Sequence, residues 1–244
     1  MRFAACLVST SALLFSASVC AVQTPQATSQ TANLDVRSET EAPRFVVIGI
    51  DRTENWETMT RPALRLAETT IRQSHPGDEL VVRWISDRSY RSDETIAHIR
   101  LPAIPRKAVN PFDRQAKLEL AAAKSRVQSE AVRGLQLINS QQTRPATRAT
   151  DVYGFIAAAA EHFAEASPGV HKVLVIASDM GDNRKQRLYP DLRGVDVEVA
   201  LVVHADPNPV RVAALKDAWT AYFSRCGAQS VKYSPIAWDS KSAS

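Results

Sequence analysis

Phe45-Val46-Val47-Ile48-Gly49-Ile50, followed by Asp51, is the stretch of sequence that decides the fold. Residues 45–50 are apolar apart from one glycine and rich in β-branched side chains, and the run is too short for a helix. Such a run is typical of a strand that is buried on both faces. A strand of this kind needs a layer of helices above and below it, so the stretch predicts the central first strand of an α/β domain.

Helical and strand patterns alternate along the rest of the chain. Strands are expected at residues 80–85, 95–101, 173–177, 195–203 and 230–235, and helices at residues 61–73, 112–141, about 151–166 and 210–223. The connection at residues 86–94 is too short for a helical crossover, so the strand at 95–101 should run antiparallel at an edge. The predicted fold class is therefore α/β: a doubly wound, mostly parallel, Rossmann-like sheet with helices on both faces and one antiparallel edge strand.

The first residues have the pattern of an export signal. Residues 1–21 combine Arg2 with a long apolar stretch and a cleavage-like Val19-Cys20-Ala21, which predicts a signal peptide and a periplasmic or secreted protein. A lipoprotein anchored through Cys20 is the less favoured alternative, because the lipidation signal prefers a small residue where Val19 stands.

Domain boundaries follow from composition. Residues 22–44 are rich in Gln, Thr, Ser and Ala and predict a flexible linker. One domain should then cover residues 45–237, with a long helical insertion at about 112–141, and residues 238–244 form a tail.

Composition excludes several classes of protein. The 244 residues are 45% hydrophobic and 23% charged, as in an ordinary globular chain. Removing residues 1–21 deletes Arg2 and no acid, so the net charge falls from +4 to +3, too little to indicate a nucleic-acid partner. No later segment is apolar for long enough to span a membrane, and the widely spaced glycines exclude a glycine-rich phosphate loop.

Three segments bring oxygen-bearing side chains to strand ends or helix starts. They are Asp51-Arg52-Thr53-Glu54-Asn55 after the first strand, Thr150-Asp151 before the alanine-rich helix, and Asp179-Met180-Gly181-Asp182-Asn183 after the strand at 173–177. Ligands of open parallel sheets bind beyond the carboxyl ends of the strands, where the strand order reverses. Oxygen ligands of this kind suit a hard divalent cation such as Mg²⁺.

In these segments the chain resembles the von Willebrand factor type A family, whose metal-ion-dependent adhesion site has an Asp-x-Ser-x-Ser loop, a Thr and a later Asp. The resemblance implies the metal ligands Asp51, Thr53, Asn55, Thr150 and Asp179, with Glu54, Trp56, Asp151 and Asp182 as accessory residues. Thr53 keeps a hydroxyl where the family has Ser, Asn55 replaces a hydroxyl by an amide, and Met180 stands where Gly is usual. Mg²⁺, or else Mn²⁺ or Ca²⁺, is the implied cofactor.

The function that the resemblance implies is binding of a protein ligand, whose acidic side chain completes the coordination of the cation. Two alternatives stay open: a scaffold with a non-functional metal site that binds through the long helix and a basic edge, and a metal-assisted hydrolase. The hydrolase is the weaker one, because no histidine pair, Gly-x-Ser-x-Gly elbow or activated Cys226 accompanies the acids. We therefore expect a protein that is not an enzyme.

The two acids at the strand ends can be ligands or structural residues. Asp51 and Asp179 should face an exposed cleft as ligands, unless they only cap helices and accept backbone N–H groups.

The long helix should be broken or bent near Gly134, and should either overhang as a docking surface or fold back over the strand at 95–101.

Basic residues gather around the edge hairpin. They should form a solvated face or, less favoured, a surface for an acidic partner: Arg83, Arg88, Arg91, Arg100, Arg106 and Lys107.

Overall fold

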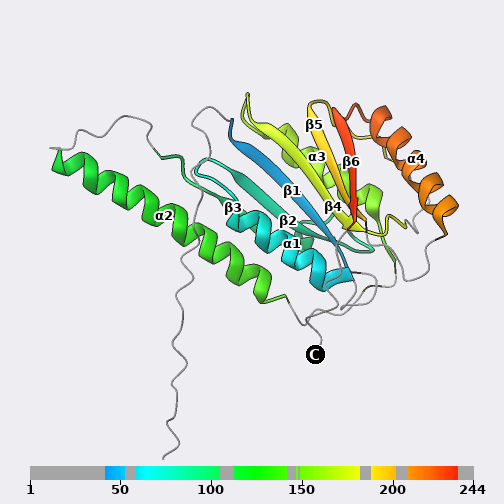
Figure 1. Cartoon of the computed structure of the whole chain (residues 1–244), viewed down its shortest axis with the longest axis horizontal. Coiled ribbons are helices and arrows are strands. Elements are labelled where there is room, and N and C mark those ends of the chain that lie inside the picture. Colours follow the sequence, from blue (N-terminus) through cyan, green and yellow to red (C-terminus); the bar gives the residue numbers. More distant parts are fainter. Residues whose placement is uncertain are drawn as a thin grey trace, which may run out of the picture. The chain divides into compact units, whose positions relative to one another are not determined.

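A computed structural model describes residues 42–52, 59–104, 113–141, 147, 149–181, 188–201 and 208–235. The predicted signal peptide, nearly all of the predicted linker and the predicted tail at 238–244 lie outside these residues. The elements, shown in Figure 1, are β1 (Arg44–Asp51), α1 (Arg61–Arg72), β2 (Glu79–Ile85), the short 3₁₀ helix η2 (Ser92–Glu94), β3 (Thr95–Arg100), α2 (Arg114–Asn139), α3 (Val152–Ala164), β4 (His171–Ser178), β5 (Val195–Leu201), α4 (Pro209–Arg225) and β6 (Ser230–Pro235).

The strands form one six-stranded sheet in the order β3-β2-β1-β4-β5-β6. All neighbouring pairs are parallel except β2 and β3, which pair antiparallel, so the predicted antiparallel edge strand is confirmed. The strand β1 lies between β2 and β4, and the chain order reverses there. The carboxyl ends of β1 and β4 therefore lie at the point where α/β sheets of this kind bind ligands.

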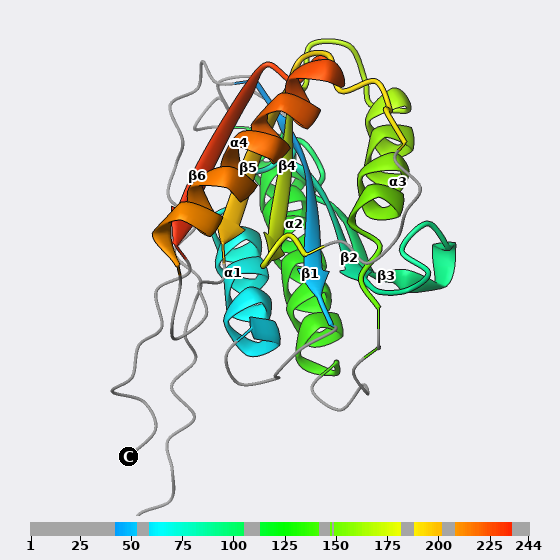
Figure 2. The ribbon, with the colours of Figure 1, turned by 90° about the vertical axis from the view of Figure 1, so that its right-hand side faces the viewer.

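Helices cover both faces of the sheet, with α1 and α2 on one face and α3 and α4 on the other (Figure 2). Side chains of β1 alternate between the two cores: Val46, Ile48 and Ile50 pack with α1 and α2, whereas Phe45 and Val47 pack with α3 and α4. The predicted doubly wound α/β fold with a strand buried on both faces is confirmed.

The long helix α2 has 26 residues and runs without a break through Gly134, so the predicted break there is wrong. A Cβ atom at Gly134 would lie 2.2 Å from Cδ1 of Ile99 on β3. The close approach of helix and strand at this position therefore favours glycine.

The carboxyl-terminal half of α2 folds back over the edge strand, as one of the two sequence alternatives predicted. The helix α2 packs against α1 and β3, and its buried stripe lies mostly in this half: Ala123, Val127, Ala131, Gly134 and Ile138. Arg133 also donates a hydrogen bond of 3.1 Å to the carbonyl oxygen of His98 on β3. The first turns of α2 extend beyond the sheet in Figure 1, and their use as a docking surface stays a prediction.

None of the helices that the structure describes has the length and apolar character of a membrane span.

Replacement of Gly134 by alanine tests the close contact between α2 and β3. Alanine favours a helix by about 1 kcal/mol over glycine, but the new methyl group overlaps the buried Ile99, and overpacking of a core costs about 1–3 kcal/mol. We expect a net loss of stability in urea unfolding. Combining Gly134→Ala with Ile99→Val, which removes Cδ1, should recover part of that loss, whereas Ser129→Ala on the exposed face should be neutral. Strictly additive effects of the two core substitutions would contradict the contact.

Candidate functional site

The candidate site lies at the carboxyl ends of β1 and β4. Asp51 is the last residue of β1, and Asp179 directly follows β4. The two strands are hydrogen-bonded neighbours in parallel register, with Ile50 opposite Ala177. The prediction that these two loops are neighbours is therefore confirmed by the topology.

Asp51 is completely buried, with an exposed fraction of 0%, which corrects the expectation that its carboxylate faces an exposed cleft. The hydroxyl of Ser178 donates a hydrogen bond of 2.6 Å to Oδ2 of Asp51. Alternation along β1 directs Asp51 toward the α3 face, because Ile50 packs toward α1 and α2. Asp51 does not cap a helix through this contact. It anchors the end of one strand to the end of the next.

Ser178 is a site residue that the sequence analysis missed. The residue is fully buried, and its hydroxyl also accepts a hydrogen bond of 2.9 Å from the backbone N–H of Met180. One signal was present in the sequence, since a polar Ser178 ends an otherwise apolar strand immediately before Asp179. Its pairing with Asp51 depends on the register between β1 and β4, which the sequence alone does not give.

The turn after β4 is held by a strained, buried methionine. Met180 has φ 62°, in the left-handed region that favours glycine, and it stands where the family pattern has glycine. Its side chain is 1% exposed within the core of α3 and α4, and its carbonyl accepts a hydrogen bond of 3.1 Å from the indole N–H of Trp219. Burial and this hydrogen bond offset the conformational strain.

Asp179 is half-buried, and its Oδ1 accepts a hydrogen bond of 2.8 Å from the backbone N–H of Gly181. This is the contact expected if an acid that follows a strand only accepts a backbone N–H group of its own turn. The expectation that the carboxylate lies toward solvent fits Asp179 better than Asp51.

Two adjacent residues at the start of α3, Thr150 and Asp151, have different roles. Asp151 is the N-cap of the helix, and its Oδ1 accepts a hydrogen bond of 2.8 Å from the N–H of Gly154. Its own N–H donates to the carbonyl of Ser86 at 2.8 Å, which ties α3 to the end of β2. Thr150, which is 3% exposed, directly precedes this cap and is not the capping residue. Its role as a metal ligand stays a prediction.

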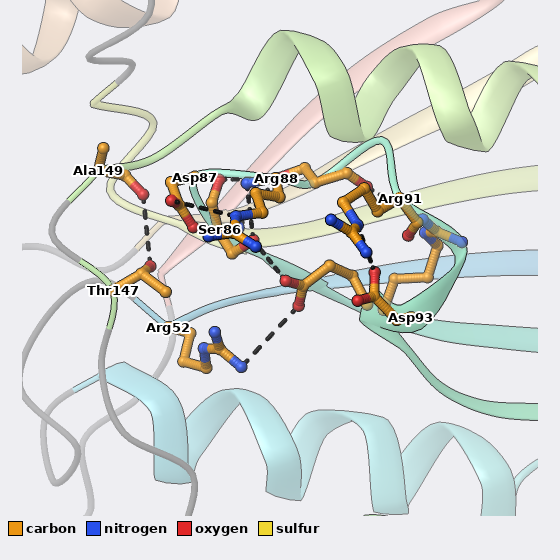
Figure 3. A network of polar contacts seen from close by, with 11 residues as sticks. Arg52, Ser86, Asp87, Arg88, Arg91, Asp93, Thr147 and Ala149 are labelled. Carbon is orange, nitrogen blue, oxygen red and sulfur yellow. Dashed lines mark hydrogen bonds and ion pairs between the residues drawn. The ribbon is translucent and has the colours of Figure 1, made fainter.

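Arg52 does not share the face of Asp51. Its guanidinium lies 3.9 Å from a carboxylate oxygen of Glu94 and 5.7 Å from the ring centroid of Trp84. Figure 3 shows Arg52 on the α1 side of the strand ends, whereas Ser86 lies toward α3. A cation adjacent in sequence to Asp51 is therefore directed away from the candidate site.

The rest of the predicted set lies outside the described residues: Thr53, Glu54, Asn55, Trp56 and Asp182. Within the part of the chain that the structure does describe, no group of three or more His, Cys, Asp or Glu side chains is placed to hold a metal. The predicted ligand set contains only two carboxylates, Asp51 and Asp179, and takes its other oxygens from hydroxyl and amide groups.

The donor atoms at this edge fit a hard cation. Two carboxylates and the hydroxyl groups of Thr150 and Ser178 are all oxygen donors, and Mg²⁺ takes such donors while keeping some of its waters. A carboxylate has about four acceptor positions, so the hydrogen bond from Ser178 is compatible with a cation at Asp51.

The expectation of a basic, solvated edge is wrong for Arg83, and acids neutralise the charge of other arginines there. Arg83 is 3% exposed and lies beneath the hairpin loop, where it donates to the carbonyls of Ser89 and Arg91 at 3.0 and 2.7 Å. The exposed arginines of this edge each face an acid: Arg88 with Asp87, Arg91 with Asp93, and Arg100 with Glu79. Arg106 and Lys107 lie outside the described residues. The described hairpin therefore offers little uncompensated positive charge.

The other side chains that could react or bind a ligand pack against neighbouring residues of the fold. Cys226 is buried, and burial raises the pKa of its thiol, which favours the unreactive protonated form. Trp84 belongs to the core on the α1 and α2 face, and Trp219 to the core on the α3 and α4 face. His162 lies 3.4 Å from Arg83, and burial together with that positive charge and His98 lowers the pKa of its imidazole.

No protein-family model matches the chain, and a search of curated proteins finds no match either.

Substitution at position 180 tests whether burial holds a strained backbone. Met180→Ala and Met180→Gly both remove a buried side chain, at a cost of about 2–5 kcal/mol. Because φ is positive there, we expect the glycine variant to be more stable than the alanine variant by about 1 kcal/mol in urea unfolding. Met59 is equally buried and has no positive φ, so it serves as the control at which alanine should be better than glycine. Alanine being the better residue at both positions would contradict the assignment.

The lowered pKa of His162 makes stability depend on pH. The folded protein resists protonating this imidazole, whereas the unfolded chain takes up the proton near its ordinary pKa of about 6.5. Wild-type stability should therefore fall as pH decreases below about 6.5, because the unfolded state binds more protons. In His162→Gln, urea unfolding between about pH 5 and 7 should depend less on pH. Equal slopes in both proteins would exclude this contribution.

Proposed function

We propose that the chain is an exported protein-binding module that holds a divalent cation at the carboxyl ends of β1 and β4. The observation that carries the proposal is the buried Asp51 carboxylate, fixed by Ser178 where the strand order reverses. The likeness of the surrounding segments to the von Willebrand factor type A pattern supports it. The cation is Mg²⁺, or else Mn²⁺ or Ca²⁺.

The proposed ligands come from three segments. Asp51, Thr150 and Asp179 belong to the described residues, and Thr53 and Asn55 would add a hydroxyl and an amide oxygen from the loop after β1. When bound, the cation supplies an open coordination position that a carboxylate of the partner fills. Ser178 positions Asp51, and the Met180 turn positions Asp179.

Binding at Asp51 should also stabilise the fold. Ser178 holds one oxygen of the buried Asp51 carboxylate. A cation that binds only the folded protein adds its binding free energy to the free energy of unfolding.

The proposed role is binding rather than catalysis, because the nucleophile and general base that a metal-assisted hydrolase needs are missing from the sequence motifs. Export rests on the signal pattern of residues 1–21. The competing proposal is a scaffold with a degenerate metal site that docks partners through α2. This scaffold proposal is supported by the part of α2 that projects beyond the sheet.

Calorimetric titration with Mg²⁺ and Mn²⁺ tests the proposed cation site. We expect wild-type protein to bind one cation, and Asp179→Asn to weaken binding by more than roughly tenfold with little change in stability, since Asp179 is half-buried. Asp51→Asn keeps an acceptor for Ser178 and should also lose affinity. Thr150→Val removes one oxygen at nearly constant volume and should weaken binding less.

Asp191→Asn is the matched control, because Asp191 lies on an exposed loop and pairs with Arg193. It should bind the cation like the wild type. Lack of binding by the wild type, or equal affinity in Asp51→Asn and wild type, would reject the cation site and favour the scaffold.

A further inference from the structure

The outward face of α2 carries two exposed large apolar side chains, Leu118 and Val132, away from its buried stripe. The positions that join them at alternating three- and four-residue spacings define what we call the outer seam, which also includes polar residues: Leu118, Ala121, Ser125, Gln128 and Val132. All five are exposed. Leu118 and Val132 have exposed fractions of 57% and 45%, which places them among the exposed large apolar side chains of the described chain.

The spacing of the outer seam is that of a helix-pairing surface. Leu118, Ser125 and Val132 lie seven residues apart, the repeat that keeps one face of a helix against a partner helix. Single exposed apolar residues are common on any surface, but Leu118 and Val132 lie two heptads apart on one face of a helix that extends past the sheet (Figure 1). Of the positions between them, Ala121 and Ser125 are small enough to let a partner helix approach, and Gln128 is polar.

Positive charge flanks one side of the outer seam. Lys117 and Lys124 stand one position before Leu118 and Ser125. Among the described residues these two lysines make no ion pair, whereas Arg133 farther along is paired with Glu130 at 2.7 Å. The flanking positions on the other side, Ala122 and Ser129, are uncharged.

The charges decide which partner fits. A second copy of α2 would bring Lys117, Lys124, Ala122 and Ser129 to the flanks, and none of these is an acid. An anionic membrane surface is disfavoured because helices that lie in the lipid interface use Trp, Phe and Leu, and α2 has no aromatic residue. An acidic helix would complement both the seam and its flanks.

We propose that the outer seam of α2 docks an amphipathic helix of a partner protein that carries Glu or Asp beside its apolar stripe. This surface lies on a helix that supplies none of the proposed cation ligands, so the proposal does not depend on the cation site. It specifies the kind of partner that the second candidate function, docking through α2, would take.

The test uses a labelled acidic peptide of about 28 residues, with Leu and Ala at the seam positions of four heptads and Glu at the flanks. Fluorescence anisotropy at about 0.15 M salt, where the screening length is about 8 Å, should show saturable binding to the full chain. Lys117→Glu with Lys124→Glu should weaken binding by more than roughly tenfold. Leu118→Gln with Val132→Gln should also weaken it by more than roughly tenfold.

Matched controls separate docking from general charge attraction. Arg211→Glu with Arg225→Glu makes the same change of charge on exposed positions of α4, across the sheet, and should leave binding unchanged. A scrambled acidic peptide and a peptide with Lys at the flanks should not bind. Equal binding of the scrambled peptide, loss with the Lys pair but not with the Leu118 and Val132 pair, or no binding at all would overturn the proposal. Preferential binding to phosphatidylglycerol vesicles, or a dimer of the free chain in sedimentation, would also overturn it.

Discussion

Burial of β1 on both faces and along both edges is the constraint on which the rest of the fold depends. Val47 and Ile48 point to opposite cores, and both are 0% exposed. Each face therefore needs its own pair of helices, and the chain must return from the β3 edge to place β4 beside β1. That return produces the reversal of strand order at the end of β1, where Asp51 leaves the sheet.

The sequence predicted those features that local patterns control. Apolar runs located the central strands, alternation located β3, and the short connection at 86–94 correctly made β3 an antiparallel edge. Burial of Asp51 and Arg83 could not be predicted, because it depends on partners brought by register and loop closure: Ser178 for one, and the carbonyls of Ser89 and Arg91 for the other. Gly134 was misread for the same reason, since its contact with Ile99 is tertiary.

At the candidate site, three acids make different structural contacts. Asp151 is committed to capping α3, while Asp179 closes a local turn and Asp51 joins two strands. These contacts fix the side chains in place before any ligand arrives, which is the preorganisation that a binding site requires. The same hydrogen bonds would stabilise the strand ends without a ligand. The positions of these side chains therefore do not depend on whether a cation is bound there.

The two halves of α2 are held by very different amounts of tertiary structure. The carboxyl-terminal half is locked to β3 and α1 through Gly134 and Ile138, whereas the amino-terminal turns have exposed side chains on most of their circumference. Helical turns without packing are marginally stable, so α2 should open from its first turns as a unit smaller than the domain. Its beginning can unwind and reform while the sheet, and every residue at the ends of β1 and β4, stays folded.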